Sequence, residues 1–251
     1  MSSMKRYRCF FLFAFVMLPL IGLSEVDSQI KETDSTALYN VEFTDDFIVT
    51  GEGNATNWQK ASWMHLIQST RHNADVSRTT KVKILYSQTG IYFLFYCQDE
   101  KLTATMDSDF MDLWKEDVVE VFLLPDENQP AYFEYELSPL NYELAIIVSN
   151  IEGELYRWKP FHYESDRKPR HATAVRGGKK ESFGDISAYT AEFFIPYRLL
   201  RPLNNISPKP GTRWRANFYR IDYDKERVQW SWQPTEKTNH EYKKFGTLYF
   251  K

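Results

Sequence analysis

Residues 112–124 combine a tryptophan with acidic residues at a spacing that suits sugar binding. Trp114 precedes Asp117 and Glu120, and a strand-like apolar run begins directly after Asp117. Sugars present an apolar face of C–H groups and a rim of hydroxyls, so proteins hold them with an aromatic ring and with charged or polar groups. Trp114, Asp117 and Glu120 are therefore candidate carbohydrate-binding residues.

Further aromatic and polar side chains could complete such a site. Trp158 lies in a loop-like segment and could provide a second ring, although it and Trp114 could also serve only in packing. Arg215 and Asn217 alternate with Trp214 along a strand-like run, so they point away from the face that carries the tryptophan. They could reach a ligand from that face, or they could form a solvated sheet surface. Trp214 itself, in this strand pattern, is predicted to be a core residue, and so is the tryptophan at position 232.

Paired carboxylates would also suit glycoside hydrolysis, which uses two acids roughly 5–10 Å apart. Asp117 with Glu120, and Glu134 with Glu136, form such pairs by sequence. A chain with 34 acidic residues offers many pairs, so the pattern alone does not discriminate. Neither a Gly-x-Ser-x-Gly nor a His-Glu-x-x-His motif occurs, and no catalytic residue is assigned. A carbohydrate-active enzyme stays an alternative to a binding protein.

A third class, electron transfer through a haem group, would need methionine and histidine ligands. The candidates are Met64, His65, Met106 and Met111. Adjacent residues of a strand point to opposite faces, which argues against Met64 and His65 acting together.

The N-terminus has the pattern of a secretory signal peptide. Basic residues precede a charge-free apolar run over residues 9–23, and small residues close that run. It is shorter than the roughly 20 apolar residues of a membrane span. We therefore predict a cleaved signal peptide over residues 1–24, a flexible polar leader over residues 25–36 and a single domain over residues 37–251.

The cysteine and charge counts argue against a lipid anchor, a cysteine metal site and a nucleic-acid partner. Cys9 lies too early in the signal peptide to be a lipidated cysteine, so we expect a secreted or periplasmic product without a membrane anchor. Cys97 is then left without an internal disulfide partner and cannot build a cysteine metal site. Removing residues 1–24 leaves 28 basic against 34 acidic residues, with no long block of like charge. A nucleic-acid partner is therefore not expected.

Short runs rich in β-branched and aromatic residues recur through the predicted domain and are separated by Gly, Pro and Asn. No long amphipathic pattern indicates a helix. The sequence therefore predicts an all-β, jelly-roll-like β-sandwich of antiparallel sheets. The expected strands are residues 81–86, 91–98, 118–124, 131–138, 142–149, 170–176, 188–195, 213–222, 228–232 and 245–250.

One of these runs shows the alternation of a half-buried strand. Over residues 131–138, apolar residues such as Phe133 and Leu137 alternate with Glu134 and Glu136. A strand presents these two sets on opposite faces. We expect the apolar face to pack and the polar face to meet water.

Six segments, in order along nearly the whole predicted domain, resemble carbohydrate-binding module family 9 and its broader family-9-like relatives. The run from Trp114 through Asp117 to Glu120 resembles the family's Trp-x-x-Asp-x-Val-Glu signature. The other matching segments are residues 132–139, 191–200, 214–220, 230–235 and 245–250.

The resemblance implies a DOMON-like β-sandwich that clamps the end of a glycan between two tryptophans and often carries structural calcium. It assigns Trp114 as the first ring and Glu120 as the hydrogen-bonding carboxylate. In members attached to xylanases a second tryptophan lies just before the last strand, where this chain has residues 240–244 with Tyr242 as the aromatic residue. The implied partners are an oligosaccharide or polysaccharide ligand and a glycoside hydrolase; no cofactor other than calcium is implied.

Overall fold

The computed structural model describes residues 37–69, 77–151 and 154–251, so the predicted signal peptide and leader lie outside the described residues. No helix in these ranges is long and apolar enough to cross a membrane. The strands are β1 (Leu38–Phe43), β2 (Met64–His65), β3 (Ile67–Gln68), β4 (Thr80–Tyr86), β5 (Gly90–Gln98), β6 (Val118–Leu124), β7 (Ala131–Leu137), β8 (Glu143–Ile151), β9 (Glu154–Pro160), β10 (Arg170–Arg176), β11 (Ala188–Pro196), β12 (Arg213–Asp222), β13 (Val228–Ser231) and β14 (Gly246–Phe250). Short 3₁₀ helices are η1 (Thr56–Lys60), η2 (Leu113–Lys115), η3 (Ser165–Arg167) and η4 (Tyr242–Lys244).

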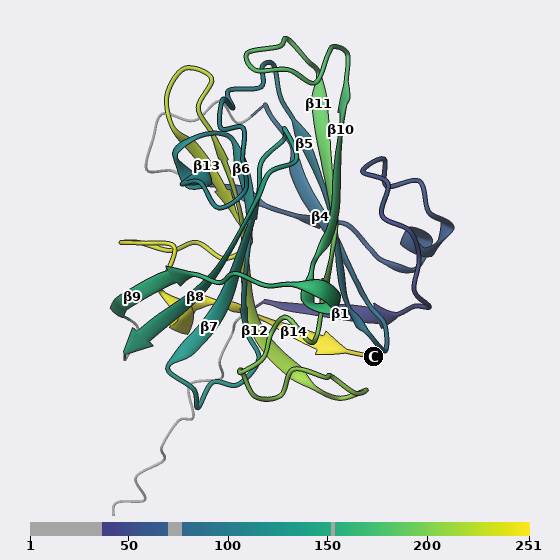
Figure 1. Cartoon of the computed structure of the whole chain (residues 1–251), viewed down its shortest axis with the longest axis vertical. Coiled ribbons are helices and arrows are strands. Elements are labelled where there is room, and N and C mark those ends of the chain that lie inside the picture. The colour runs from purple at the N-terminus through teal and green to yellow at the C-terminus, as the bar shows by residue number, and fades with distance from the viewer. Residues whose placement is uncertain (1–36, 70–76, 152–153) are drawn as a thin grey trace, which may run out of the picture. The chain divides into compact units, whose positions relative to one another are not determined.

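The strands form two layers that face one another across a core (Figure 1). Sheet A has the order β1-β14-β12-β6-β7-β8-β9, with β13 and β3 added beside β12. Sheet B has the order β10-β11-β5-β4-β1, with β2 added beside β4. The predicted all-β sandwich is confirmed, as are the ten expected strands. β1 departs from the antiparallel pattern, because it pairs parallel with β14 and then with β4.

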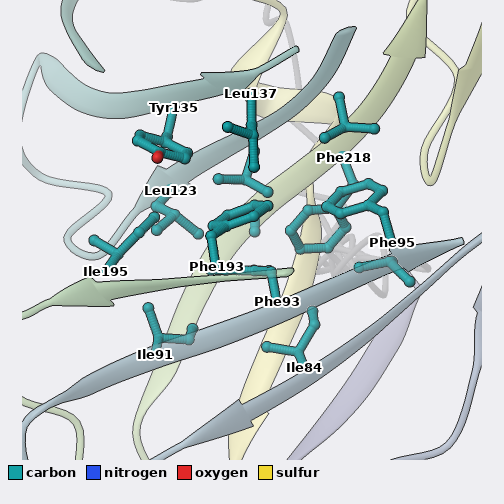
Figure 2. Packing of buried hydrophobic residues seen from close by; sticks show 14 of the residues in the cluster. Ile84, Ile91, Phe93, Phe95, Leu123, Tyr135, Leu137, Phe193, Ile195 and Phe218 are labelled. Atoms are coloured by element: carbon teal, nitrogen blue, oxygen red, sulfur yellow. The ribbon is translucent and has the colours of Figure 1, made fainter. Parts of the chain in front are cut away.

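Large apolar side chains from both sheets fill the space between them (Figure 2). Phe93 of β5 stacks on Phe193 of β11 with ring centroids 5.1 Å apart. Tyr135 of β7 and Phe218 of β12 approach the same pair from sheet A, at 5.0 and 5.9 Å. Each such side chain stabilises the fold by roughly 1.5–3 kcal/mol on burial. Trp214 also lies in this core, as predicted.

Part of the outer face of sheet A is buried as well. Phe122 of β6 and Tyr132 of β7 pack there against Phe245, which lies just before β14. The expectation that the polar face of residues 131–138 meets water is therefore wrong, since Glu134 is 5% and Glu136 0% exposed. Segments distant in sequence cover this face, and they also form the walls of a pocket on it.

Candidate functional site

A pocket of about 360 Å³ opens on the outer face of sheet A. Its floor comes from β6 and β7, and its walls come from η2, β9, residues 221–229 and the connection between β13 and β14. We call this connection, residues 232–245, the lining loop. The volume lies in the range of small-ligand sites in proteins.

Two tryptophans form an aromatic corner at the pocket. The rings of Trp114 and Trp158 lie 5.2 Å apart between centroids and make an angle of 77°. Trp114 belongs to η2, and its carbonyl accepts a hydrogen bond of 3.0 Å from the Tyr223 hydroxyl. Trp158 lies on β9, opposite Val148 of β8, rather than in the loop expected from sequence, and it is 39% exposed. The corner therefore offers two apolar surfaces to a ligand.

Three glutamates form the floor, and we call them the glutamate trio. Glu120 of β6 lies directly opposite Glu136 of β7 in the antiparallel register, and Glu134 lies opposite Phe122. Opposite residues have Cβ atoms about 5 Å apart, so the three carboxyl groups share one small region of the sheet. All three side chains are buried, yet they line the open pocket.

Burial raises the pKa of each member of the trio. It raises the pKa of Glu120 to about 7, although hydrogen bonding from Asn239 and the charge of Arg227 act in the opposite direction. For Glu134 and Glu136, burial and then the charge of neighbouring Glu120 raise the pKa well above the ordinary value. Burial therefore favours the protonated form of these carboxyl groups, and in that form they both donate and accept hydrogen bonds.

Replacing Glu136 with Gln should stabilise the protein in mildly alkaline buffer. The raised pKa of Glu136 means that the folded protein binds more protons than the unfolded chain, so stability falls as the pH rises from the ordinary carboxyl pKa of about 4.5 through the raised value. Glu136→Gln removes part of this loss and should gain roughly 1–3 kcal/mol there, with little change at mildly acidic pH. Urea unfolding at both pH values measures the difference.

The exposed Glu127 provides the matched control, since Glu127→Gln should leave the pH dependence unchanged. A Glu136→Gln variant that is less stable than the wild type in alkaline buffer would contradict this account of the trio.

His240 forms part of the wall contributed by the lining loop. Its ring stacks on Phe122 with centroids 5.3 Å apart, and its Nδ1 shares a hydrogen bond with the Tyr132 hydroxyl. The same Nδ1 lies 4.0 Å from Glu134 Oε2. Burial lowers the pKa of His240 to about 4, so the imidazole is neutral at physiological pH.

Arg215 and Asn217 lie on the outer face of β12, as expected, but they hold the lining loop. Arg215 donates hydrogen bonds to the carbonyls of Lys243, at 3.2 Å, and Phe245. The Asn217 side-chain amide donates a hydrogen bond of 2.9 Å to the Gln233 carbonyl, and its Oδ1 accepts one of 2.9 Å from the Gln233 N–H group. Neither residue lines the pocket.

Asp117 and Tyr242 also lie outside the pocket lining. Asp117 is buried and accepts hydrogen bonds from the backbone N–H groups of Thr103, at 2.6 Å, and Tyr223, at 2.8 Å. It thereby joins two segments beside η2. Tyr242 belongs to η4 and packs against the outer apolar cluster.

Of the predicted binding residues, the structure brings Trp114, Glu120 and Trp158 together at the pocket. Their contact with a ligand stays a prediction. Sequence reasoning named Glu134 and Glu136 only as one carboxylate pair among many; their position opposite the β6 strand that carries Glu120 is the signal that could have selected them.

The haem candidates do not line this pocket. Met64 is buried in the core, whereas the adjacent His65 is exposed on the other side of β2. Met106 packs beside the outer cluster, and Met111 is 39% exposed.

Calcium, which the resemblance implies, has one candidate group in the described part of the chain. Carboxylate oxygens of Asp99, Asp222 and Asp224 lie within 4.8 Å of one another. Arg220 Nη2 lies 2.6 Å from Asp222 and 3.0 Å from Asp99, and Arg78 Nη1 lies 2.7 Å from Asp222 and 2.9 Å from Asp224. The guanidinium groups already neutralise the oxygens that a calcium ion would need, so these residues do not fit the ion.

The sequence matches one family model and one protein relative. Residues 49–251 match the family model described as carbohydrate family 9 binding domain-like. A protein of Arthroderma benhamiae named "Extracellular protein" is 27% identical over 153 residues, which cover 59% of this chain and 65% of that protein. The chain thus matches just under two thirds of that relative's length.

Three solved structures share the fold at low sequence identity. A family 9 carbohydrate-binding module from Caldicellulosiruptor kristjanssonii, in complex with cellotriose, has a TM-score of 0.60 and 16% identity, covering 86% of this chain and 94% of that one. A family 9 module from the same organism, in complex with glucose, has a TM-score of 0.57 and 15% sequence identity. The match covers 86% of this chain and 96% of that one. A Bacteroides uniformis protein proposed to bind carbohydrate has a TM-score of 0.70 and 16% sequence identity. The match covers 86% of this chain and 100% of that one.

Proposed function

The chain belongs to the carbohydrate family 9 binding domain-like family, and from this premise we propose that it binds a glycan in the pocket on sheet A. The observation that carries the proposal is the aromatic corner of Trp114 and Trp158 beside the glutamate trio. The rings suit the apolar face of a sugar, and the carboxyl oxygens suit its hydroxyls. Modules with this fold bind cellotriose and glucose, which supports the same ligand class here.

Replacing Trp114 with Ala tests the proposal. Loss of a ring that a sugar covers should weaken binding about 10- to 100-fold. Calorimetry measures this with the oligosaccharide that binds best on a glycan array containing cello- and xylo-oligosaccharides.

Trp63→Ala is the matched control, because Trp63 lies beneath the ammonium groups of Lys81 and Lys83, outside the pocket lining. It should bind like the wild type. Trp114→Ala should keep the wild-type circular dichroism spectrum and Tm. A variant that unfolds would show that the ring is a core residue, and unchanged affinity would refute the site.

The same geometry favours binding over glycoside hydrolysis. Hydrolysis needs one protonated acid and one ionised carboxylate at the scissile bond. Burial instead raises the pKa of Glu120, Glu134 and Glu136 in the same direction, so the surroundings do not separate one acid from one base. Release of reducing sugar from the ligand found on the array would reverse this preference.

Export completes the proposed function. The basic and then apolar N-terminus supports a signal peptide over residues 1–24, a leader over residues 25–36 and a binding domain over residues 37–251. The relative named "Extracellular protein" supports secretion. A periplasmic destination, the absence of a lipid anchor and a partner glycoside hydrolase stay predictions.

A further inference from the structure

Two members of the glutamate trio, Glu134 and Glu136, differ from the other buried carboxylates of the described residues in their hydrogen-bond partners. Glu192 accepts hydrogen bonds from backbone N–H groups and from the Trp58 indole. Glu143 accepts from two tyrosine hydroxyls, and Asp117 accepts from two backbone N–H groups. The remaining two, Asp99 and Asp222, are paired with arginines.

Within the trio, three carboxyl oxygens have no such partner. Oε2 of Glu134 and both oxygens of Glu136 are buried and lack a hydrogen bond of ordinary length, although the two carboxyl groups interact with one another and the Trp114 backbone interacts with Glu136. Buried polar groups are almost always hydrogen-bonded, and exceptions at a pocket indicate a ligand site. Glu134 and Glu136 belong to the pocket lining beside the aromatic corner. Their three oxygens are almost fully covered, so a ligand in the pocket reaches them once the side chains that cover them shift.

The cations around the pocket do not neutralise this part of its floor. Arg227 acts on Glu120, and its guanidinium donates a hydrogen bond of 2.6 Å to Gln229. No lysine or arginine of the described chain forms an ion pair with Glu134 or Glu136. The nearest basic group is the neutral imidazole of His240, at 4.0 Å from Glu134. Lys237 contributes to the wall from the lining loop.

A bound ligand can provide hydrogen bonds to the carboxyl oxygens of Glu134 and Glu136 in two ways. Sugar hydroxyls can donate hydrogen bonds to these oxygens, but they bring no charge that would stabilise the ionised carboxylates. A protonated amine donates up to three hydrogen bonds and also brings the opposite charge, which favours the ionised carboxylates. Hydrogen bonds between two charged groups are stronger than those between neutral groups.

We propose that the pocket prefers a sugar with a free, protonated amino group, held by Glu134 and Glu136 while its ring lies against the Trp114–Trp158 corner. This inference rests on the proposed function and narrows its ligand to glycans that end in an unacetylated amino sugar, such as chitosan fragments. Glycans with carboxylate or sulfate groups are disfavoured at the same floor. N-acetylation removes the charge and should remove the preference.

Calorimetry with a matched series of disaccharides tests the inference. The series is cellobiose, its diamino counterpart from chitosan and the N-acetylated form of the latter, all at neutral pH. The amino form should bind the wild type about tenfold or more tightly than cellobiose. The N-acetylated form should bind no more tightly than cellobiose. Binding of the amino form should also release protons from the trio, seen as a dependence of the heat on the buffer.

A double variant, Glu134→Gln with Glu136→Gln, should bind the amino and neutral disaccharides alike, while Glu127→Gln should keep the preference. Should the double variant fail to fold, the wild-type series still decides the question. Equal or tighter binding of cellobiose would overturn the amino-sugar preference and leave glycan binding standing. No binding of any saccharide, in this series or on the array, would overturn both.

Discussion

Replacing Arg220 with Met should lower the free energy of unfolding by about 3–5 kcal/mol, because it leaves buried carboxylates without their partner. The Arg220 side chain is fully buried and lies 3.0 Å from Asp99 and 2.6 Å from Asp222. It also donates a hydrogen bond of 2.6 Å to the carbonyl of Gln98 and lies against the Trp230 ring. One guanidinium therefore joins β12 to β5 across the sandwich. Urea unfolding monitored by tryptophan fluorescence measures the loss.

The loss should depend on pH in a defined direction. Burial already raises the pKa of Asp99 to about 7 in the presence of Arg220, and removing the arginine raises it further. The variant should therefore recover part of its stability at acidic pH, where the carboxyl groups are protonated.

Arg213→Met is the matched control, since Arg213 lies on the same strand but is exposed. It should change stability by less than about 0.5 kcal/mol. A wild-type protein that loses stability in a chelator would contradict this account, because a metal ion rather than the arginines would then neutralise the aspartates.

Replacing Glu192 with Ala should also lower the free energy of unfolding by about 3–5 kcal/mol, because buried hydrogen-bond donors lose their acceptor. The Glu192 carboxylate, on β11, accepts hydrogen bonds from Thr50 N, at 2.9 Å, Gly51 N, at 2.8 Å, and Trp58 Nε1, at 2.8 Å. Without it, two buried donors, Gly51 N–H and the Trp58 indole, and the partly buried Thr50 N–H lose their acceptor. Denaturant unfolding and amide hydrogen exchange of Trp58 measure the global and local effects.

Glu52 lies in the same segment and is exposed, so Glu52→Ala should leave both measurements near the wild-type values. If Glu192→Ala kept wild-type stability, the segment would be held by its apolar contacts, chiefly those of Trp58, rather than by the carboxylate.

The sequence predicted most strands because their apolar residues alternate or run continuously between turn residues. β9 escaped prediction because its residues are exposed on both faces, so no alternation marks it as a strand. β1 has only one buried residue, Val41, which leaves its pattern equally weak. Local pattern therefore identifies strands that pack on a core and misses those at its margins.

The sequence predicted the part of the candidate site that contains Trp114 and Glu120, but not the part that contains Glu134 and Glu136. The spacing from Trp114 to Glu120 reflects one local feature, a 3₁₀ turn that leads into β6. The burial of Glu134 and Glu136 depends instead on the lining loop, which follows them by about a hundred residues and is positioned by Arg215 and Asn217. Alternation shows that these glutamates leave the core face, but it cannot show that a distant segment covers the other face.

The parallel pairing of β1 also has a consequence for the timing of folding. Leu38 pairs with Thr247, near the opposite end of the chain, while Phe43 pairs with Tyr86. Contacts of such long sequence separation form slowly, and this one cannot form before β14 has been synthesised. The hydrogen-bonded link that runs from sheet A through β1 to sheet B is therefore completed only after β14 has been made, although β1 and β4 can pair earlier.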